Sequence, residues 1–224
     1  MKIRTFFAVL LCKLARGLLR LLRRGGTAFP GRVALKVYPQ VLGVLSRGVR
    51  VILVTGTNGK TTSTYLLKHV LEKTLGAKVG LIGTIQNMIG DEILHTERTT
   101  PESFELQKLF ADMRDAGCTH VIMEVSSHAL VLHRADQIRF GAAVFTNLTE
   151  DHLDFHQTMD AYCDAKAMIF RRCETGAVNV DDAYAKRIME QADCRLLTYS
   201  AQRTPAAGRA GCRHARHSRH FQRL

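Results

Sequence analysis

The sequence predicts an α/β fold with a doubly wound, mostly parallel sheet and a P-loop-type nucleotide site. Between residues 50 and 200, short continuous apolar runs alternate with longer segments of helical period, and such apolar runs are typical of strands covered on both faces. A glycine-rich loop follows the first of these strands and leads directly into a helix, the usual setting of a phosphate-binding loop. With 46% hydrophobic and 23% charged residues, the 224-residue chain has the composition of a protein with a packed core.

The elements of this predicted domain run from residue 50 to residue 200. Strands are expected at 50–55, 78–83, 119–125, 142–146, 177–180 and 195–199, and helices at 60–75, 101–116, 159–171 and 182–191. Pro101 is expected in the first turn of its helix, where proline is tolerated. Because ligands bind beyond the carboxyl ends of parallel strands, we expect a site in the segments after Thr55, Val125 and Thr146.

Residues 1–49 are expected to form a basic amphipathic helix followed by a loop. Apolar residues recur every three or four positions from 2 to 24, beside a second stripe of Lys and Arg. Three interpretations stay open: a helix that docks on a membrane surface or a partner, a helix that packs on the domain, or a targeting segment. Lys13 and Arg16 interrupt the apolar run, which is therefore too short to span a membrane. The loop is predicted by Gly25, Gly26, Pro30 and Gly31.

The net charge of +12 does not indicate a nucleic-acid partner, because it comes from the two ends of the chain. Residues 1–50 hold 11 Lys and Arg and residues 201–224 hold 6 Arg, with no acidic residue in either segment. Residues 201–224 have no apolar period and are expected to form a disordered basic tail. The six cysteines contain no C-x-x-C pair, so we expect reduced thiols in a cytoplasmic protein and no zinc ribbon or disulfide framework.

The segment T-G-T-N-G-K-T-T, residues 55–62, has the residue types that a phosphate cradle needs. Glycines let backbone N–H groups approach phosphate oxygens, Lys60 can reach the outer phosphates, and Thr61 can bind Mg²⁺. Val54 stands where the common motif has its first glycine, so pattern matching alone would miss this loop. The alternative is a glycine loop with only a structural role. The predicted nucleotide-binding residues are Gly56, Thr57, Asn58, Gly59, Lys60, Thr61 and Thr62.

Acidic residues and histidines follow two later strands, in M-E-V-S-S-H at 123–128 and F-T-N-L-T-E-D-H-L-D-F-H at 145–156. In a doubly wound sheet both clusters lie at the edge that carries the nucleotide loop. Carboxylates and imidazoles at that edge favour a second Mg²⁺. The alternative is that Glu124 is a structural strand residue and that the histidines are surface groups.

Taken together, these motifs resemble the central ATPase domain of the Mur ligase family. The resemblance rests on T-G-T-N-G-K-T-T, T-T-P-E at 99–102, E-V-S-S-H-A-L at 124–130, F-T-N-L-x-x-D-H-L-D-x-H and the pair Ala165–Lys166. It covers residues 51–200, and the motif order is most similar to the family member that adds the third amino acid of the peptidoglycan stem peptide.

The resemblance implies roles for individual residues. Lys60 would bind the ATP phosphates as a catalytic residue, and Thr61, Glu124 and His152 would hold Mg²⁺. Lys166 would be carbamylated, act as a catalytic residue and help to hold the metal; the alternative is an exposed helix lysine. Carbamylation is chemically reasonable, because burial lowers the pKa of a lysine and the neutral amine can take up CO₂ to form an anion. The implied substrate-binding residues are Thr99, Thr100, Ser126 and Arg134.

The resemblance also implies a function, an ATP- and Mg²⁺-dependent carboxylate–amine ligase of peptidoglycan precursor synthesis. ATP would phosphorylate the terminal carboxylate of UDP-N-acetylmuramoyl-L-alanyl-D-glutamate, and the amine of diaminopimelate or lysine would attack the acyl phosphate. The sequence does not indicate which of these two amino acids is added. Members of the family carry one domain before and one domain after the central domain, so we expect a truncated form.

Two other functions stay open at this point. Residues 24–28 and 30–36 resemble the start of the Mur-ligase-like amidating subunit of the lipid-linked isoglutaminyl synthase. That subunit carries a cysteine-rich zinc ribbon, which the sequence does not contain. The second alternative is a catalytically inactive ATP-binding module that docks on a membrane or a partner through residues 2–24. Product formation separates the enzymes from the module, and lipid co-sedimentation tests the docking.

Overall fold

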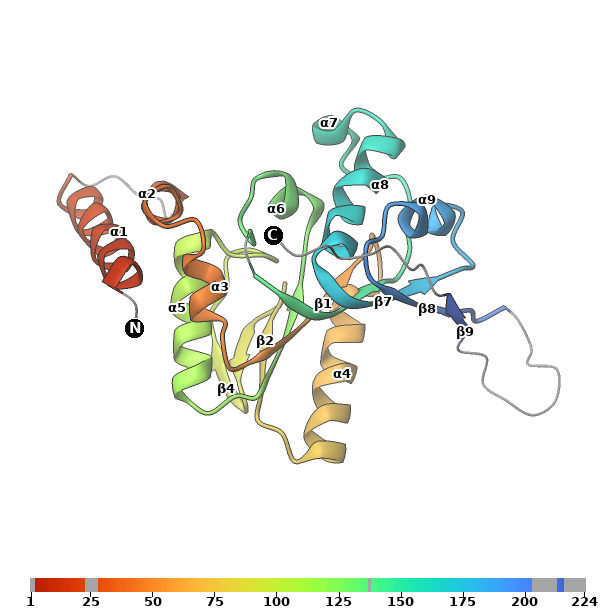
Figure 1. Ribbon diagram of the computed structural model, residues 1–224, viewed down its shortest axis with the longest axis horizontal. Coiled ribbons are helices and arrows are strands. Elements are labelled where there is room, and N and C mark those ends of the chain that lie inside the picture. The colour runs from red at the N-terminus through yellow and green to blue at the C-terminus, as the bar shows by residue number, and fades with distance from the viewer. Residues whose placement is uncertain (1–2, 23–27, 137, 203–212, 216–224) are drawn as a thin grey trace.

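The computed structural model describes residues 3–22, 28–136, 138–202 and 213–215, which form an α/β structure around one sheet (Figure 1). The strands are β1 Arg50–Thr55, β2 Val79–Ile82, β3 Asn87–Ile89, β4 Glu92–Leu94, β5 His120–Glu124, β6 Phe140–Phe145, β7 Cys173–Asn179, β8 Arg195–Tyr199 and β9 Arg213–Ala215. Within the described residues they lie in the order β4-β3-β2-β5-β1-β6-β7-β8-β9.

The centre of the sheet is parallel and its two edges are antiparallel. Each neighbouring pair from β2 through β5, β1, β6 and β7 to β8 is parallel. Strands β3 and β4 extend one edge and β9 extends the other, in each case in antiparallel orientation. The mostly parallel sheet that the sequence predicts is therefore confirmed, whereas β3 and β4 were not predicted. Strand β1 lies between β5 and β6, so the strand order changes direction at β1.

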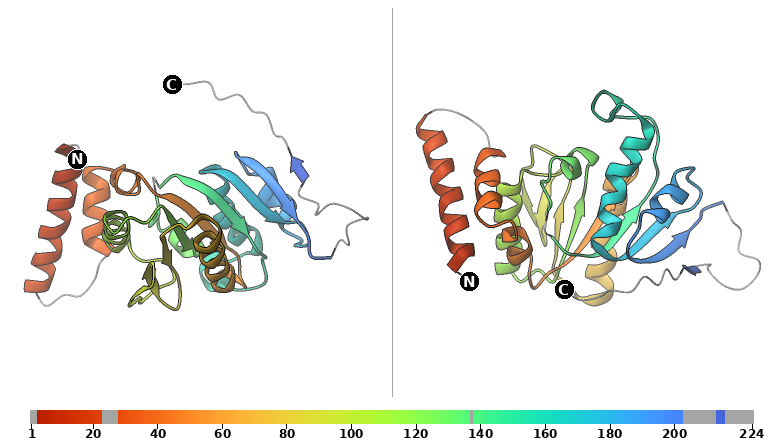
Figure 2. Two further views of the ribbon diagram at one scale, coloured as in Figure 1. Left: turned by 90° about the horizontal axis from the view of Figure 1, so that it is seen from below. Right: turned by 45° about the horizontal axis from the view of Figure 1, so that its top comes forward.

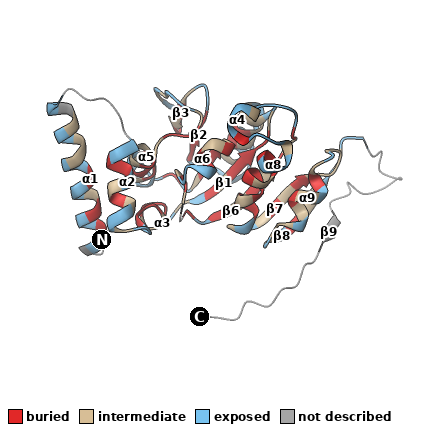
Figure 3. Cartoon of the chain, turned by 90° about the horizontal axis from the view of Figure 1, so that it is seen from above, coloured by how far each residue is buried: buried red, intermediate tan, exposed pale blue. Residues whose placement is uncertain are grey.

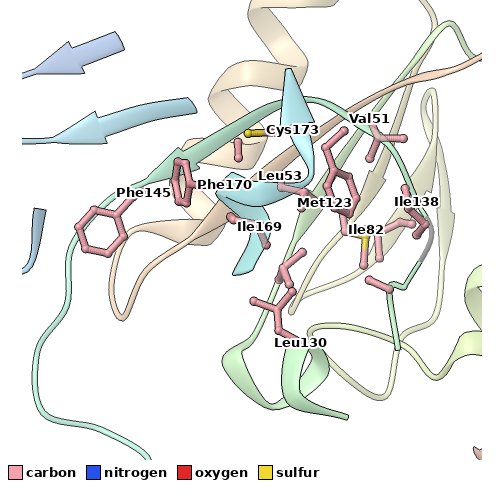
Figure 4. Packing of buried hydrophobic residues seen from close by; sticks show 14 of the residues in the cluster. Val51, Leu53, Ile82, Met123, Leu130, Ile138, Phe145, Ile169, Phe170 and Cys173 are labelled. Atoms are coloured by element: carbon pink, nitrogen blue, oxygen red, sulfur yellow. The ribbon is translucent and has the colours of Figure 1, made fainter. Parts of the chain in front are cut away.

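The strand β1 buries both of its faces. Ile52 and Val54 pack on one side with Leu67 and Leu71 of α4 (Lys60–Leu75), where Val79 and Ile122 complete a small apolar cluster. The alternate residues of β1 join the larger core on the opposite side, with Ile169 and Phe170 (Figure 4). In Figure 1, α4 lies below the sheet, and α6 (Ser127–Val131) and α8 (Met159–Ala167) lie above it. Helices on both faces explain why the strands are continuously apolar.

Most of the predicted helices are present at the predicted positions, but their first and last residues often differ from the prediction. Helix α4 has the predicted bounds, whereas the predicted helix at 159–171 divides into α8 and a 3₁₀ helix, η1 Met168–Arg171. Helix α9 covers Ala185–Glu190. The short helices α6 and α7 (Leu153–His156) were not predicted, because neither is long enough to show a helical period.

Helix α5 (Ser103–Asp115) begins two residues later than predicted. Glu102 is its N-cap residue, and the backbone N–H of Glu102 donates a hydrogen bond to the Glu105 carboxylate over 3.1 Å. This reciprocal capping box satisfies the free N–H groups at the start of the helix. Pro101 therefore lies outside the helix, and its prediction in the first turn was wrong.

Three helices precede the sheet in the described part of the N-terminal segment: α1 Ile3–Leu21, α2 Ala28–Val37 and α3 Val41–Leu45. Helix α1 is at the outer edge of the molecule, and α2 separates it from α5 (Figure 2). The predicted amphipathic helix is present, but the loop prediction was wrong at Pro30 and Gly31, which lie inside α2. Proline is tolerated in the first turn of a helix, where no intrahelical N–H donor is lost. Gly25 and Gly26 lie outside the described residues.

Residues 213–215 correct one part of the prediction for the tail. They form β9, which pairs with β8 through Leu196, Leu197 and Thr198. The expectation of disorder therefore does not hold for these three residues, because a β-strand can add to a sheet edge by main-chain hydrogen bonds without an apolar pattern of its own. The rest of the predicted tail beyond residue 202 lies outside the described residues.

The first prediction concerns the contact between α2 and α5. A Cβ atom on Gly31 would overlap the Ser103 hydroxyl and lie 2.7 Å from the backbone nitrogen of Phe104, whereas one on Gly17 of α1 would meet nothing within 4 Å. We expect Gly31→Ala to lower the free energy of unfolding by about 1–3 kcal/mol. Gly17→Ala should raise it by about 1 kcal/mol, because alanine favours an open helix position. Urea unfolding of both variants measures the difference, and a stabilising effect at both positions would contradict the close α2–α5 contact.

Candidate active site

The candidate site lies where β1, β5 and β6 end side by side. Strand β1 pairs with β5 and with β6 in parallel, so the segments that follow Thr55, Glu124 and Phe145 leave the sheet at the same edge. This edge is the place at which a doubly wound sheet binds its ligands. The three segments that the sequence singled out are therefore neighbours.

Gly56 brings the loop after β1 against the end of β6. A Cβ atom at this position would overlap the Thr146 hydroxyl and approach the backbone nitrogen of Asn147 to 3.2 Å, so only glycine fits. Asn147 then holds the loop, because its carbonyl accepts the Thr57 N–H over 3.0 Å and its side-chain oxygen accepts the Asn58 N–H over 2.8 Å. Asn147 was not among the residues predicted for the site, although its place just after β6 was a usable signal.

The loop ends at Gly59, which begins helix α4. Gly59 has φ +77°, in the left-handed region, and serves as the N-cap residue of this 16-residue helix. The first N–H groups of α4 therefore face the loop, as in an anion-binding helix terminus. Thr62 lies exposed in the first turn, and Thr61 is half-buried.

Lys60 folds back over the loop that precedes it. Its ammonium donates hydrogen bonds to the carbonyl oxygens of Gly56 over 3.0 Å and Thr57 over 2.7 Å. Burial lowers the pKa of Lys60, and the carboxylates of Glu124 and Asp151 partly oppose that shift. The side chain is thus held at the mouth of the loop that the sequence predicts to bind phosphates.

Glu124 is the buried carboxylate of the site. Its side chain is 0% exposed and accepts hydrogen bonds from the hydroxyls of Thr61 over 3.2 Å and Thr84 over 2.9 Å. The Thr84 N–H adds a third hydrogen bond, of 3.2 Å. No Lys or Arg forms an ion pair with Glu124 within the described ranges. A buried carboxylate without a cationic partner, beside hydroxyl oxygens, fits Mg²⁺, which prefers oxygen ligands.

Thr84 is a site residue that sequence reasoning missed. It follows β2, and its hydroxyl contacts both Glu124 and the hydroxyl of Thr99, the latter over 3.1 Å. The position after a parallel strand was again the only available signal, because no recognisable motif surrounds it.

Lys166 is 2% exposed, on α8. Its nitrogen donates to the Gly56 carbonyl over 2.8 Å, so this carbonyl accepts from Lys60 and Lys166 together. Burial, followed by repulsion from Lys60, lowers the pKa of Lys166 to about 7. The Lys166 nitrogen also lies 4.5 Å from the centre of the Tyr162 ring. The alternative of an exposed helix lysine is thereby wrong.

His152 lies among aromatic rings. The centre of its ring is 4.8 Å from that of His128 and 6.0 Å from that of Tyr162. Its backbone has φ +55°, an unusual conformation for a residue with a side chain. His156 stacks on Tyr162 at 5.0 Å and contacts the Ser127 hydroxyl at 2.8 Å. Burial lowers the pKa values of His128 and His156.

The four predicted metal ligands are only partly brought together. Thr61 contacts Glu124, whereas His152 and Lys166 both lie against Tyr162. In the part of the chain that the structure describes, no group of three or more His, Cys, Asp or Glu side chains is arranged to hold a metal ion. Glu124 and Thr61 are therefore the two predicted metal ligands that contact each other directly.

The four predicted substrate residues gather at the end of β5. The Thr100 hydroxyl donates to the Glu124 carbonyl and accepts from the Ser126 N–H, each over 3.1 Å. Arg134 donates to the Thr100 carbonyl over 3.3 Å and pairs with Glu102 at 2.9 Å. Thr99 is half-buried, whereas Thr100 is 1% exposed. Thr100 therefore acts on the site through its contacts with Glu124 and Ser126.

Comparison with known proteins identifies the family. The Mur ligase middle domain family matches residues 54–222. The chain belongs to the Mur ligase family. Its fold is similar to a solved structure of a UDP-N-acetylmuramoyl-L-alanyl-D-glutamate–2,6-diaminopimelate ligase, with a TM-score of 0.65 and 31% identity over 80% of this chain and 36% of that one.

Curated Mur ligases show higher identity. The chain is 48% identical over 158 residues to the UDP-N-acetylmuramoyl-L-alanyl-D-glutamate–2,6-diaminopimelate ligase of Clostridium botulinum, a match of 70% of this chain and 32% of the relative. The ligase of the same name from Streptomyces coelicolor is 47% identical over 179 residues, or 79% of this chain and 34% of the relative. The chain thus spans about a third of the length of the curated Mur ligases that it matches.

The second prediction tests the metal fit at Glu124. Mg²⁺ alone should stabilise the wild-type chain, by about 1.4 kcal/mol when its free concentration is about ten times Kd. Glu124→Gln should abolish this stabilisation, because the amide keeps the shape of the side chain and removes its charge. Glu72→Gln is the control, since Glu72 pairs with Lys68 on α4. Thermal unfolding with and without Mg²⁺ is the measurement, and an equal shift in Glu124→Gln would contradict the assignment.

Proposed function

We propose that the chain binds Mg–ATP at residues 56–62 and is the ATP-binding part of an acid–amino-acid ligase. This ligase adds diaminopimelate to UDP-N-acetylmuramoyl-L-alanyl-D-glutamate. The observation that carries the proposal is the contact of the buried Glu124 with Thr61, beside the loop that Lys60 covers. The names of the relatives, at 46–52% identity, support the amino acid and the acceptor.

In this proposal the loop binds and orients the nucleotide. The N–H groups of Gly59 to Thr62 and the positive end of α4 hold the phosphates, and Lys60 leaves the loop carbonyls to bind the outer phosphate oxygens. Thr61 and Glu124 would hold Mg²⁺, which would supply charge neutralisation for the transferring phosphoryl group. The acceptor carboxylate attacks the terminal phosphorus of ATP and forms an acyl phosphate, with ADP as the leaving group. The amine of the incoming amino acid then attacks the acyl carbon, forms the amide, loses a proton and displaces inorganic phosphate.

The remaining predicted residues divide between the acceptor and the metal. Arg134, which contacts Thr100 and Glu102, supplies a guanidinium for an anionic group of the acceptor, and Thr99 and Ser126 face the same substrate. Thr100 keeps Ser126 and the end of β5 in place. Lys166 would take up CO₂ as a neutral amine and release a proton, and the resulting carbamate and His152, which both lie beside Tyr162, would supply ligands for a metal ion.

The third prediction concerns Lys60. Lys60→Ala should weaken Mg–ATP binding by roughly 10- to 100-fold, the effect of losing charge-assisted hydrogen bonds of about 1.5–3 kcal/mol. Lys73→Ala, an exposed lysine in the last turn of the same helix, should bind as the wild type does. Titration calorimetry measures both. If Lys60→Ala and the wild type had equal affinity, residues 56–62 would not be the phosphate site.

The fourth prediction is a pH dependence of Lys166. With a pKa of about 7, the amine is mostly protonated at pH 6 and mostly neutral at pH 8. Only the neutral amine reacts with CO₂ to form a carbamate and release a proton, so carbamate occupancy should rise across this interval. Carbon-13 NMR with labelled bicarbonate detects the carbamate, and Lys166→Met should lose the signal. A signal that is unchanged in Lys166→Met would refute the assignment.

Product analysis tests the ligase directly. The chain is incubated with ATP, Mg²⁺, UDP-N-acetylmuramoyl-L-alanyl-D-glutamate and either diaminopimelate or lysine, and ADP and the tripeptide product are measured separately. A second arm replaces the corresponding segment of the Clostridium botulinum ligase with residues 54–200 of this chain. We expect the ligase that carries residues 54–200 of this chain to form the diaminopimelate-containing product. The Lys60→Ala substitution in that protein should abolish product formation. Product that persists in Lys60→Ala would contradict the proposal.

A further inference from the structure

Helix α1 carries two apolar faces, and only one of them is buried. The inner face is made of small side chains: Thr5 and Ala8 are 0% exposed and Cys12 is 1% exposed. The Cys12 thiol donates to the carbonyl of Pro30 in α2, over 2.9 Å. Ala34 of α2 belongs to the same apolar cluster. The inner face therefore accounts for the attachment of α1 to the molecule.

The outer face of α1 is large, apolar and exposed. We define it by Phe7, Leu10, Leu11, Leu14, Leu18 and Leu21, whose exposed fractions lie between 38% and 81%. The spacing of three and four places these residues on one side of the helix, opposite the small residues of the inner face. Figure 3 shows α1 at the edge of the molecule, with α2 on its inner side. Isolated exposed leucines are ordinary, but a continuous apolar face marks an interaction surface.

The charges around the outer face are all positive. Arg4 and Lys13 are exposed on α1. Residues 1–50 contain 11 Lys and Arg and no Asp or Glu. Arg16 is used differently, because its guanidinium lies 4.5 Å from the centre of the Phe104 ring in α5 and so helps to hold the helix in place.

This combination selects one kind of partner. A second copy of the chain would bring the same basic, acid-free segment against itself, and the like charges would oppose the contact. An anionic bilayer offers both an apolar layer for leucine and phenylalanine and negative headgroups for arginine and lysine. None of the described helices is long and apolar enough to cross a membrane. We propose that α1 lies in the interface of an anionic lipid bilayer, with its outer face among the acyl chains and with Arg4 and Lys13 at the headgroups.

The test is co-sedimentation of the whole chain with vesicles. Vesicles of phosphatidylglycerol and phosphatidylcholine should bind the wild type, and vesicles of phosphatidylcholine alone should bind it about 25-fold more weakly, from about fivefold for each of two basic residues. The variant Leu11→Gln, Leu14→Gln, Leu18→Gln should bind the anionic vesicles about 100-fold more weakly, because each leucine contributes about fivefold. The matched control replaces Leu66, Val70 and Leu75 of α4 by Gln, residues that are 43–61% exposed, and should bind as the wild type does.

A fluorescent probe supplies a second, independent measurement. The sequence contains no Trp, so Phe7→Trp places a single indole on the outer face. Its emission should shift to shorter wavelength with anionic vesicles, and brominated lipid should quench it, whereas Val70→Trp on α4 should show neither effect.

Three results would overturn the proposal: equal binding to neutral and anionic vesicles, unchanged binding of the outer-face variant, or a Phe7→Trp emission that ignores lipid. A wild-type dimer that the outer-face variant converts to a monomer, without vesicle binding, would assign the face to self-association instead. Mg–ATP affinity of the outer-face variant is measured in parallel and should equal that of the wild type, because α1 contributes no residue to the candidate active site.

Discussion

The contact between Gly56 and residues 146–147 is the constraint on which the site depends. Because Gly56 has no side chain, the loop after β1 can lie directly on the end of β6, where Asn147 binds two of its N–H groups. The carbonyl of Gly56 then accepts hydrogen bonds from two amines, those of Lys60 and Lys166. These two lysines belong to α4 and α8, which lie far apart from each other in the sequence. One small residue thus joins β1, β6, α4 and α8 at a single point.

The site contains two buried ionisable side chains, Glu124 and Lys166, whose charges are not neutralised by an ion pair among the described residues. Glu124 is fully buried, and among the described residues its carboxylate accepts hydrogen bonds from hydroxyl and N–H groups without an ion pair, so its charge favours an incoming cation. Lys166 is buried beside another amine, and its pKa falls because both surroundings disfavour the ammonium form. The protein holds these groups in place through the packing of the sheet, since β5 and β1 are buried on both faces. Stability and reactivity therefore depend on the same strands.

The two faces of helix α1 differ in the size of their side chains and in what they contact. Small residues on the inner face of α1 allow a close approach to α2, and Gly31 of α2 allows the same approach to α5. The six large apolar residues of the outer face are 38–81% exposed, so a large part of their surface lies away from this packing. A helix that only packed on the domain would carry its leucines on the inner face. The pattern of exposure therefore assigns the inner face of α1 to packing on the domain, and the outer face is the one for which we propose the lipid contact.

The sequence by itself predicted the parallel strands of the central domain and the segments that form its candidate site. Helix α4 has the predicted bounds, and the loop, the Glu124 segment and the histidine segment all follow strands as expected, because these signals are local in the chain. Only the tertiary structure decided that Thr84 contacts Glu124, that Asn147 holds the loop and that Lys166 is buried against Gly56. These contacts join residues 40, 89 and 110 positions apart, and a local pattern does not encode which distant backbone a side chain will meet.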